Sequence, residues 1–247
     1  MMAIGAWAPN RLPNLAIWHD IGVLPGADND PIGTVPNLYL TGSTFDDTQA
    51  DGAKQPQLKL GVQNGRRGLF WPVGDFWYEC TGALPAGGPS TICLAVRRVA
   101  FSETYLATTL RGGAADTYVV ALADNQATSK AEFAGAMPSG LPLKHRIAMD
   151  AALDTNAHAY GMAFDGVDTG DPASYTPNLD GAVPTLSLGE FDRFQAGDVG
   201  MLGAYVHAGV SQNRYNGYLF ERCLFDRQLS AYEIAIVVQY LKTKWGI

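Results

Sequence analysis

The stretch from Tyr215 to Ile247 constrains the fold of this chain most, because it predicts a strand, a corner and a helix in succession. Asn216 and Gly217 form a typical turn pair, and alternating side chains then favour a strand from Tyr218 to Phe225. Strict alternation predicts one face made of Tyr218, Phe220, Arg222 and Leu224, and the other made of Leu219, Glu221, Cys223 and Phe225.

A helix is predicted over residues 230–245. Ser230 and Glu233 have the spacing of a capping box, and Gly246 suits the helix end. A helix with one apolar face has to bury that face against another element, and a sheet is the expected partner. The apolar residues that recur at helical spacing are Ile234, Val237, Val238, Leu241 and Trp245.

The rest of the chain is typical of an all-β protein, with about a dozen short strands joined by turns. Strands are predicted at residues 14–21, 90–100, 145–152 and 157–164, among others. The chain has 247 residues, a length that one sandwich can fill, with 28 Gly and 14 Pro to supply turns. We therefore predict one domain, residues 14–247, built as a two-sheet antiparallel jelly-roll sandwich with a single C-terminal helix. Residues 1–13 are predicted to form an N-terminal arm.

Three segments carry a family resemblance. The C-terminal stretch is similar to the end of laminin-G-like, concanavalin A-like lectin/glucanase domains of the bacterial and phage type, and the upstream segments Asn14–Gly22 and Thr48–Trp71 resemble the opening parts of such domains. The resemblance implies a β-sandwich over nearly the whole chain. It implies no single function, because this fold occurs in lectins, adhesins, hydrolases, lyases and structural virion modules. The matching C-terminal positions are Asn216-Gly217, Glu221, Phe225-Asp226-Arg227, Leu229-Ser230, Glu233, Tyr240-Leu241 and Lys244-Trp245-Gly246.

Composition excludes several classes of partner. The net charge of -7 argues against nucleic-acid binding, and no apolar run is long enough to cross a membrane. The first residues lack the pattern of a secretion signal. Cys80, Cys93 and Cys223 are odd in number and have no metal-like spacing, so we predict free, buried thiols in a protein that folds in a reducing cytosol.

Catalytic patterns are sparse. Hydrolases of this fold place several carboxylates on alternate positions of one strand, and the nearest fragment here holds only Glu190 and Asp192. This fragment is expected in a loop after a strand that ends at Leu188. We therefore predict a non-enzymatic protein, with a glycoside hydrolase or polysaccharide lyase as the alternative.

One acidic loop is a candidate calcium site. Asp165, Asp168 and Asp171 are spaced three apart, and calcium prefers clustered oxygen ligands. The order of residues does not match a dedicated calcium loop, and Asp165-Gly166 also suits a hairpin turn. The prediction is that no cofactor is needed, with calcium as the alternative.

Carbohydrate binding requires exposed aromatic rings together with polar groups for the sugar hydroxyls. The loop candidates are Asp116, Tyr175, Asn213 and Arg214. Four tryptophans are instead expected in the core, because they occupy strand or helix positions: Trp18, Trp71, Trp77 and Trp245.

The sequence favours a binding or structural module on a virion surface, such as a capsid decoration, fibre or tail appendage, that also binds host surface glycans. A virion protein is made in the host cytoplasm and acts outside the cell, which reconciles an adhesion fold with unpaired cysteines. The expected partners are other virion proteins, glycans and further copies of the chain. Ile4 and Trp7 of the arm either dock on a neighbouring subunit or fold back near the terminal helix. A bacterial adhesin fragment is a further alternative.

Overall fold

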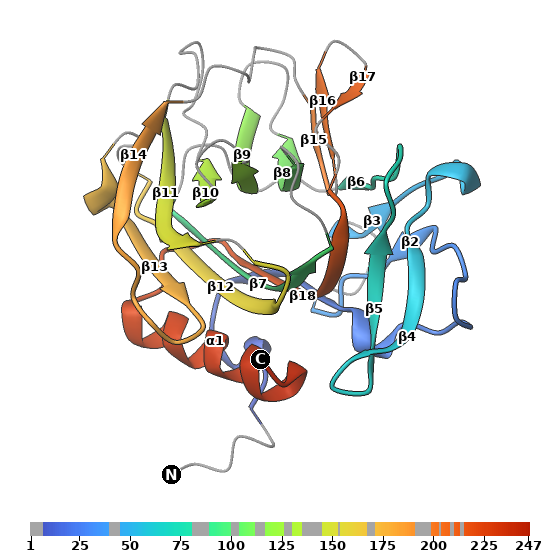
Figure 1. The fold of residues 1–247 in the computed structure, drawn as a ribbon. Coiled ribbons are helices and arrows are strands. Elements are labelled where there is room, and N and C mark those ends of the chain that lie inside the picture. The colour runs from blue at the N-terminus through green and yellow to red at the C-terminus, as the bar shows by residue number, and fades with distance from the viewer. Residues whose placement is uncertain are drawn as a thin grey trace.

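The structure is a computed structural model (Figure 1). It describes residues 7–39, 45–80, 89–99, 104–111, 117–125, 130–134, 145–152, 154–166, 171–190, 199–202, 204–207, 210–212 and 215–247. Within these residues every strand pairing is antiparallel, and no helix is long and apolar enough to cross a membrane.

Two large sheets form a sandwich, which confirms the predicted fold class. The seven-stranded sheet has the order β13-β12-β7-β18-β5-β4, with β1 also paired to β18, and the five-stranded sheet has the order β14-β11-β10-β9-β8. The first sheet consists of β1 (Leu15–Asp20), β4 (Gln57–Gln63), β5 (Arg66–Trp71), β7 (Ser90–Arg98), β12 (Ala157–Phe164), β13 (Tyr175–Leu179) and β18 (Gly217–Phe225). The second consists of β8 (Thr104–Arg111), β9 (Thr117–Asn125), β10 (Lys130–Ala134), β11 (His145–Ala152) and β14 (Leu186–Glu190).

Smaller elements complete the described chain. Two three-stranded sheets are made of β2 (Thr34–Val35), β3 (Asp47–Thr48) and β6 (Glu79–Cys80), and of β15 (Val199–Met201), β16 (Ala204–His207) and β17 (Val210–Gln212). Short 3-10 helices are η2 (Pro9–Arg11), η3 (Ile21–Val23), η5 (Gly52–Lys54) and η6 (Pro172–Ser174). The α-helix is α1 (Ala231–Trp245).

Strand β18 organises the first sheet. One side of it pairs with β7, and the other side pairs first with β5 and then with β1. The register shifts between Leu219 and Glu221, so the strict alternation predicted for this strand is wrong. Such a bulge turns successive side chains to the same face. The face toward the helix therefore carries Phe220, Glu221, Cys223 and Phe225, and the face toward the second sheet carries Leu219, Arg222 and Leu224.

The first sheet is covered on both faces. The five-stranded sheet lies over one face and α1 lies against the other, where it contacts mainly β12, β7 and β13 (Figure 1). The core between the sheets includes Leu69, Trp71, Leu94, Ile147 and Met149. The core beneath the helix contains all five predicted apolar residues of α1, which are fully buried: Ile234, Val237, Val238, Leu241 and Trp245.

Helix α1 begins and ends where the sequence predicts. The Ser230 side chain accepts a hydrogen bond from the backbone nitrogen of Glu233, and the Glu233 carboxylate accepts one from the backbone nitrogen of Ser230. Gly246 ends the helix in the left-handed conformation, with φ 66°. These contacts satisfy backbone groups that a helix end leaves open.

The N-terminal segment packs against its own domain from Trp7 onward. The Trp7 ring lies 5.5 Å from the Tyr240 ring of α1, edge to face, and Leu12 packs against the same core. Pro9, at the start of η2, is buried. This is the second of the two arrangements considered for Trp7, in which the segment folds back near the terminal helix. Ile4 lies outside the described residues.

Two of the cysteines face each other across neighbouring strands. Cys93 of β7 and Cys223 of β18 are register partners, and both are free and fully buried beneath α1. The prediction of free, buried thiols is confirmed for these two. The side chain of Cys80 lies outside the described part of the chain.

Candidate functional site

Tyr175 is buried, so the prediction that its ring is exposed in a loop is wrong. The residue begins β13, its side chain is 7% exposed, and its ring stacks on Phe164 at 5.0 Å. The two prolines nearby favoured a loop, but β13 is an edge strand, where a proline such as Pro177 is tolerated. The other three carbohydrate candidates lie outside the described residues: Asp116, Asn213 and Arg214.

The predicted calcium loop is described only in part. Asp171 uses its Oδ1 atom to accept a hydrogen bond from the backbone nitrogen of Ala173 at 2.8 Å, which caps η6. The backbone nitrogen of Asp165 donates to the carbonyl of Ser174 at 3.0 Å. Asp168 lies outside the described residues. Among the residues that are described, no group of three or more His, Cys, Asp or Glu side chains could hold a metal ion. Calcium binding stays an untested alternative.

The fragment considered for catalysis begins inside a strand, not in the predicted loop. Glu190 is the last residue of β14 and is the register partner of His145 in β11. Asp192 lies outside the described residues. The two carboxylates are therefore not brought together by anything that the structure describes.

A buried ion pair lies between β1, β3 and β18. Arg222 donates through Nη2 to Oδ2 of Asp47 at 2.6 Å and to Nδ1 of His19 at 2.8 Å. The Nε2 atom of His19 lies 3.1 Å from the carbonyl oxygen of Phe45. Burial lowers the pKa of His19, which favours the neutral imidazole that this arrangement requires. All three side chains are fully buried, so this group joins strands and is closed to ligands.

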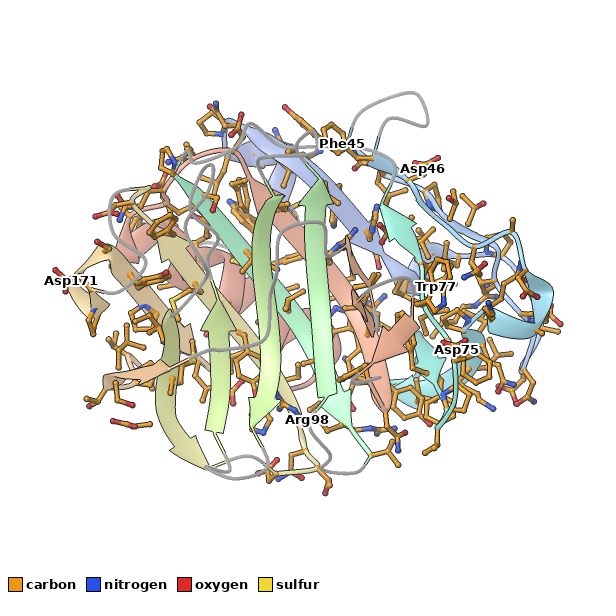
Figure 2. All side chains as sticks on the ribbon, turned by 90° about the horizontal axis from the view of Figure 1, so that it is seen from above. Phe45, Asp46, Asp75, Trp77, Arg98 and Asp171 are labelled. Atoms are coloured by element: carbon orange, nitrogen blue, oxygen red, sulfur yellow. The ribbon has the colours of Figure 1, made fainter. Side chains whose placement is uncertain are left out.

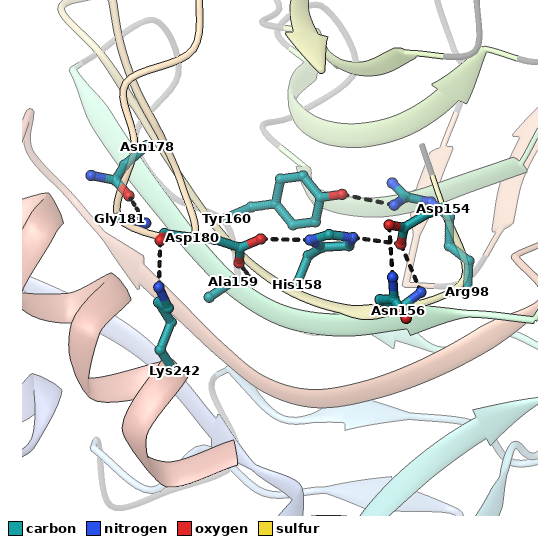
Figure 3. A network of polar contacts seen from close by, with 10 residues as sticks. All are labelled: Arg98, Asp154, Asn156, His158, Ala159, Tyr160, Asn178, Asp180, Gly181 and Lys242. Atoms are coloured by element: carbon teal, nitrogen blue, oxygen red, sulfur yellow. Dashed lines mark hydrogen bonds and ion pairs between the residues drawn. The ribbon is translucent and has the colours of Figure 1, made fainter. Parts of the chain in front are cut away.

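A second polar network lies at the N-terminal end of β12 (Figure 3). His158 has a carboxylate at each ring nitrogen: Asp180 Oδ2 at 2.6 Å from Nδ1, and Asp154 Oδ1 at 2.7 Å from Nε2. A carboxylate only accepts, so both nitrogens must donate, which requires the protonated ring. The hydrogen bond to Asp180 contributes most to raising the pKa of His158, and the bond to Asp154 adds to it, while burial opposes both. With both nitrogens occupied, His158 cannot act as a base. The two carboxylates lie on opposite sides of its ring, so they cannot bind one metal ion together.

Three of the five tryptophans, Trp7, Trp18 and Trp77, are partly buried, so the core expectation is only partly right for Trp18 as well. Trp71 and Trp245 are fully buried, as predicted, whereas Trp77 is only partly buried. Its backbone is fixed on both sides: the nitrogen donates to the carbonyl of Lys54 at 3.2 Å, and the carbonyl accepts from Nε2 of Gln49 at 3.0 Å. The expectation that Trp77 belongs to the core is therefore only partly right. Trp77 is thus a partly buried residue whose backbone is held from both sides.

The Lys54 ammonium lies near this ring and also lies near two carboxylates, and we call Asp51, Lys54, Asp75 and Trp77 the Trp77 cluster. The Lys54 ammonium lies 5.8 Å from the centre of the Trp77 ring, 3.7 Å from Asp51 Oδ2 and 3.9 Å from Asp75 Oδ2. The Lys54, Asp51 and Asp75 side chains are 37%, 52% and 40% exposed. The cluster thus combines two carboxylates and one cation within reach of solvent with a partly buried indole ring.

Local sequence positions each member of the Trp77 cluster. Asp51 caps η5 by accepting at Oδ1 from the backbone nitrogen of Ala53, which leaves its Oδ2 atom toward Lys54 at the end of the same turn. Gly74 has φ 152°, and a Cβ there would lie 2.6 Å from the Phe76 ring. This glycine therefore permits the turn that leads from β5 to Asp75 and Trp77, which lie on one side of the molecule in Figure 2.

The sequence offered a signal for this site. Lys54, Asp75 and Trp77 come from two polar or turn-rich segments on either side of the β4–β5 hairpin, in a stretch with four aromatic residues, Phe70, Trp71, Phe76 and Trp77. Alternation alone could not show which of these rings faces solvent, because the turn at Gly74 resets the pattern.

Comparison with known proteins finds distant likeness of fold. No family model matches the chain, and no curated protein matches it. A Trypanosoma rangeli sialidase in complex with sialic acid aligns over 99% of this chain and 35% of its own, with 12% identity and a TM-score of 0.45. A carbohydrate-binding module, CBM40, of the Ruminococcus gnavus IT-sialidase, bound to α2,3 sialyllactose, aligns over 69% of this chain and 96% of its own, with 14% identity and a TM-score of 0.42.

The chain spans about a third of the length of the sialidases, and their activity is theirs alone. The same module bound to α2,6 sialyllactose aligns with 13% identity and a TM-score of 0.38. Likeness at this level carries no argument about ligand or reaction. The fold that the resemblance implied is the observed one, and its bacterial and phage subtype stays a prediction.

Proposed function

We propose that this protein is a non-enzymatic, carbohydrate-binding β-sandwich module whose sugar site is the Trp77 cluster. The observation that carries the proposal is the partly buried Trp77, fixed through its backbone, with the Lys54 ammonium near its ring and the Asp51 and Asp75 carboxylates near that ammonium. A pyranose has one apolar face of C–H groups that stacks on an aromatic ring. Its hydroxyl groups then need acceptors and donors at the ring edge, which carboxylates and an ammonium supply.

Lys54 sits near the ring but is loosely held. Its distances to Asp51 and Asp75, 3.7 Å and 3.9 Å, exceed the roughly 2.7–2.9 Å of a charge-assisted hydrogen bond. Exposed ion pairs of this kind contribute little to stability. The ammonium can therefore move from the ring to a sugar hydroxyl at small cost.

Binding fits the cluster better than hydrolysis does. A glycosidase needs a general acid, which is a carboxyl group kept protonated by an apolar setting. Asp51 and Asp75 are instead half exposed, so neither has the apolar setting that a general acid needs. A glycoside hydrolase or polysaccharide lyase of this fold remains the rival proposal.

For the biological setting, we propose a virion surface, with other virion proteins and further copies of the chain as partners. The free thiols of Cys93 and Cys223 support folding in a reducing host cytoplasm. Copurification of the polypeptide with phage particles tests the setting. Its recovery only from a bacterial surface fraction would favour an adhesin.

The binding proposal is tested on a panel of immobilised neutral, amino and acidic glycans. Trp77→Ala should lose at least about tenfold in affinity, which corresponds to about 1.4 kcal/mol. Tyr232→Ala is the matched control, because Tyr232 is 76% exposed on α1 but belongs to no such cluster. Equal binding by both variants, or no glycan bound by the wild type, would overturn the proposal. Thermal melting of each variant confirms that it is folded.

A further inference from the structure

We infer that Cys93 and Cys223 form a disulfide across β7 and β18 by exchange with a small-molecule disulfide, and that undocking of α1 sets the rate. This modification site shares no residue with the Trp77 cluster and does not rest on the proposed function. Both cysteines are free thiols in the structure, and a reducing cytoplasm would keep them so until the protein meets an oxidising medium.

The two cysteines lie directly opposite each other in the sheet. Cys93 and Cys223 are register partners in the antiparallel pair of β7 and β18, and the register is regular from Glu221 to Phe225. Opposite residues in such a pair have Cα atoms about 4.5–5.5 Å apart, and a disulfide requires about 4.4–6.8 Å. Both side chains point to the same face of the sheet, because both belong to the core beneath α1. A bond between them therefore requires no shift of either strand.

The thiols are protected while α1 is docked. Both side chains are fully buried. Burial raises the pKa of the Cys93 thiol, and it is also the main cause of the raised pKa of Cys223, to which Glu221 and Asp20 add while Lys244 opposes them. Only a thiolate attacks a disulfide, so a protonated thiol that is closed off from solvent does not react.

Undocking of α1 removes this protection and leaves the strands in place. The helix takes no part in the pairing between β7 and β18, so it can lift from the sheet without breaking that ladder. Local openings of this kind cost less free energy than global unfolding. Once water reaches the two thiols, the pKa shift caused by burial disappears and thiolate can form.

The exchange consumes one small-molecule disulfide, such as oxidised glutathione. The first protein thiol releases its proton to water, and its thiolate attacks a sulfur of the small disulfide, which forms a mixed disulfide and expels one small thiolate. The second protein thiolate then attacks the protein sulfur of the mixed disulfide, which closes the Cys93–Cys223 bond and expels the second small thiolate. The two protons from the protein end on the two small thiols. The protein is thus oxidised by two electrons, and the small disulfide is reduced.

The bond is tested on folded Cys80→Ala protein, in which Cys93 and Cys223 are the remaining cysteines. After incubation with oxidised glutathione, digestion without reductant and mass spectrometry should recover two peptides joined through Cys93 and Cys223, and wild-type protein should yield the same pair. Cys93→Ser in the same background is the matched control, which should give at most a mixed disulfide with glutathione. Circular dichroism of the oxidised protein should match that of the reduced protein. Separate mixed disulfides on the two cysteines, with no joined pair, would overturn the inference.

The role of α1 is tested by the rate of bond formation. Leu241→Ala loosens the helix, whereas Ile147→Ala removes a fully buried side chain between the two sheets, in the other core. Leu241→Ala should react at least about tenfold faster than the parent protein, and Ile147→Ala should stay within about twofold of it. Gly161→Ala, which crowds the same helix, replaces Leu241→Ala if that variant does not fold.

Two results would contradict this account. Equal acceleration by Ile147→Ala and Leu241→Ala would show that the thiols react through global unfolding, and it would remove the role of α1. Thiols that stay free in the parent protein and in the loosened variants, even after long incubation with oxidised glutathione, would overturn the disulfide itself.

Discussion

The indole nitrogen of Trp245 donates a hydrogen bond to Oε2 of Glu221 across 2.8 Å, and both side chains are fully buried between α1 and the sheet. Glu221 also accepts from Trp18 Nε1 at 2.7 Å and from the Tyr240 hydroxyl at 2.9 Å, and it pairs with the Lys244 ammonium at 2.7 Å. One carboxylate thus joins β1, β18 and α1. Burial raises the pKa of Glu221, and the neighbouring Lys244 opposes this effect.

Replacing this carboxylate should therefore destabilise the whole domain. In Glu221→Gln one donor partner faces an amide NH₂ group, and Lys244 loses a buried counter-charge. We expect a loss of about 3 kcal/mol in the free energy of unfolding, measured by urea denaturation. Gln239→Ala, on the exposed side of the same helix, should cost less than about 0.5 kcal/mol. Similar midpoints for the two variants would contradict the role given to Glu221.

The close approach of α1 to β12 gives a second prediction. A Cβ on Gly161 would lie 2.5 Å from Cγ2 of Ile234 and 3.0 Å from Cγ2 of Val238, so the helix rests directly on this glycine. Gly161→Ala should push the helix away and cost roughly 1–3 kcal/mol. Leu241→Ala, at a fully buried position of the same helix, should cost about 2–5 kcal/mol, and Ser230→Ala about 1 kcal/mol. Urea midpoints equal to that of the wild type would show that α1 is not docked.

The terminal helix shows what the sequence can predict. The capping box of Ser230 and Glu233 and the apolar spacing from Ile234 to Trp245 are local signals, and the structure confirms them. The strands 145–152 and 157–164 were predicted with the observed bounds for the same reason.

Interactions between distant segments were not predictable. Glu221 and Trp18 are separated by 203 residues, as are Arg222 and His19, and no local pattern indicates that they meet. The bulge at Leu219–Glu221 places Phe220 and Glu221 on the same face of the sheet, and no glycine or proline marks it in the sequence. Trp77 was assigned to the core because it was predicted at a strand position, whereas in the structure it precedes the bridge at Tyr78 and is only partly covered.

The network around His158 predicts a pH-dependent stability. The folded-state pKa of His158 is raised above the ordinary 6.5, with the bond to Asp180 as the main cause. Protonated His158 therefore contributes stability that is fully present below about pH 6.5 and is lost as the pH rises through the folded-state pKa. Wild type and His158→Gln should differ most in melting temperature at low pH and least at high pH. A difference that is constant across pH 5–9 would contradict this.

Calcium should contribute little to stability. Asp171 already caps η6, and the backbone nitrogen of Asp165 is bonded to Ser174. Asp171→Ala should lower the free energy of unfolding by about 1 kcal/mol through the lost cap, with or without calcium. A melting temperature that rises clearly with millimolar calcium, and loses that rise in Asp168→Ala, would establish a metal site instead.

The contact between Trp7 and Tyr240 makes the N-terminal segment part of the stability of the domain. Removing residues 1–13 would expose the Tyr240 ring and the edge of the core beneath α1, where Trp7 and Leu12 now pack. We expect the truncated protein to melt several degrees lower as an isolated monomer, and Trp7→Ala to account for about 1–2 kcal/mol of the loss. Deletion of residues 1–6 alone is the matched control, because it leaves Trp7 in place. If the longer truncation keeps the melting temperature but abolishes association with particles or between copies, the segment is a docking arm and Trp7 contributes to assembly, not to folding.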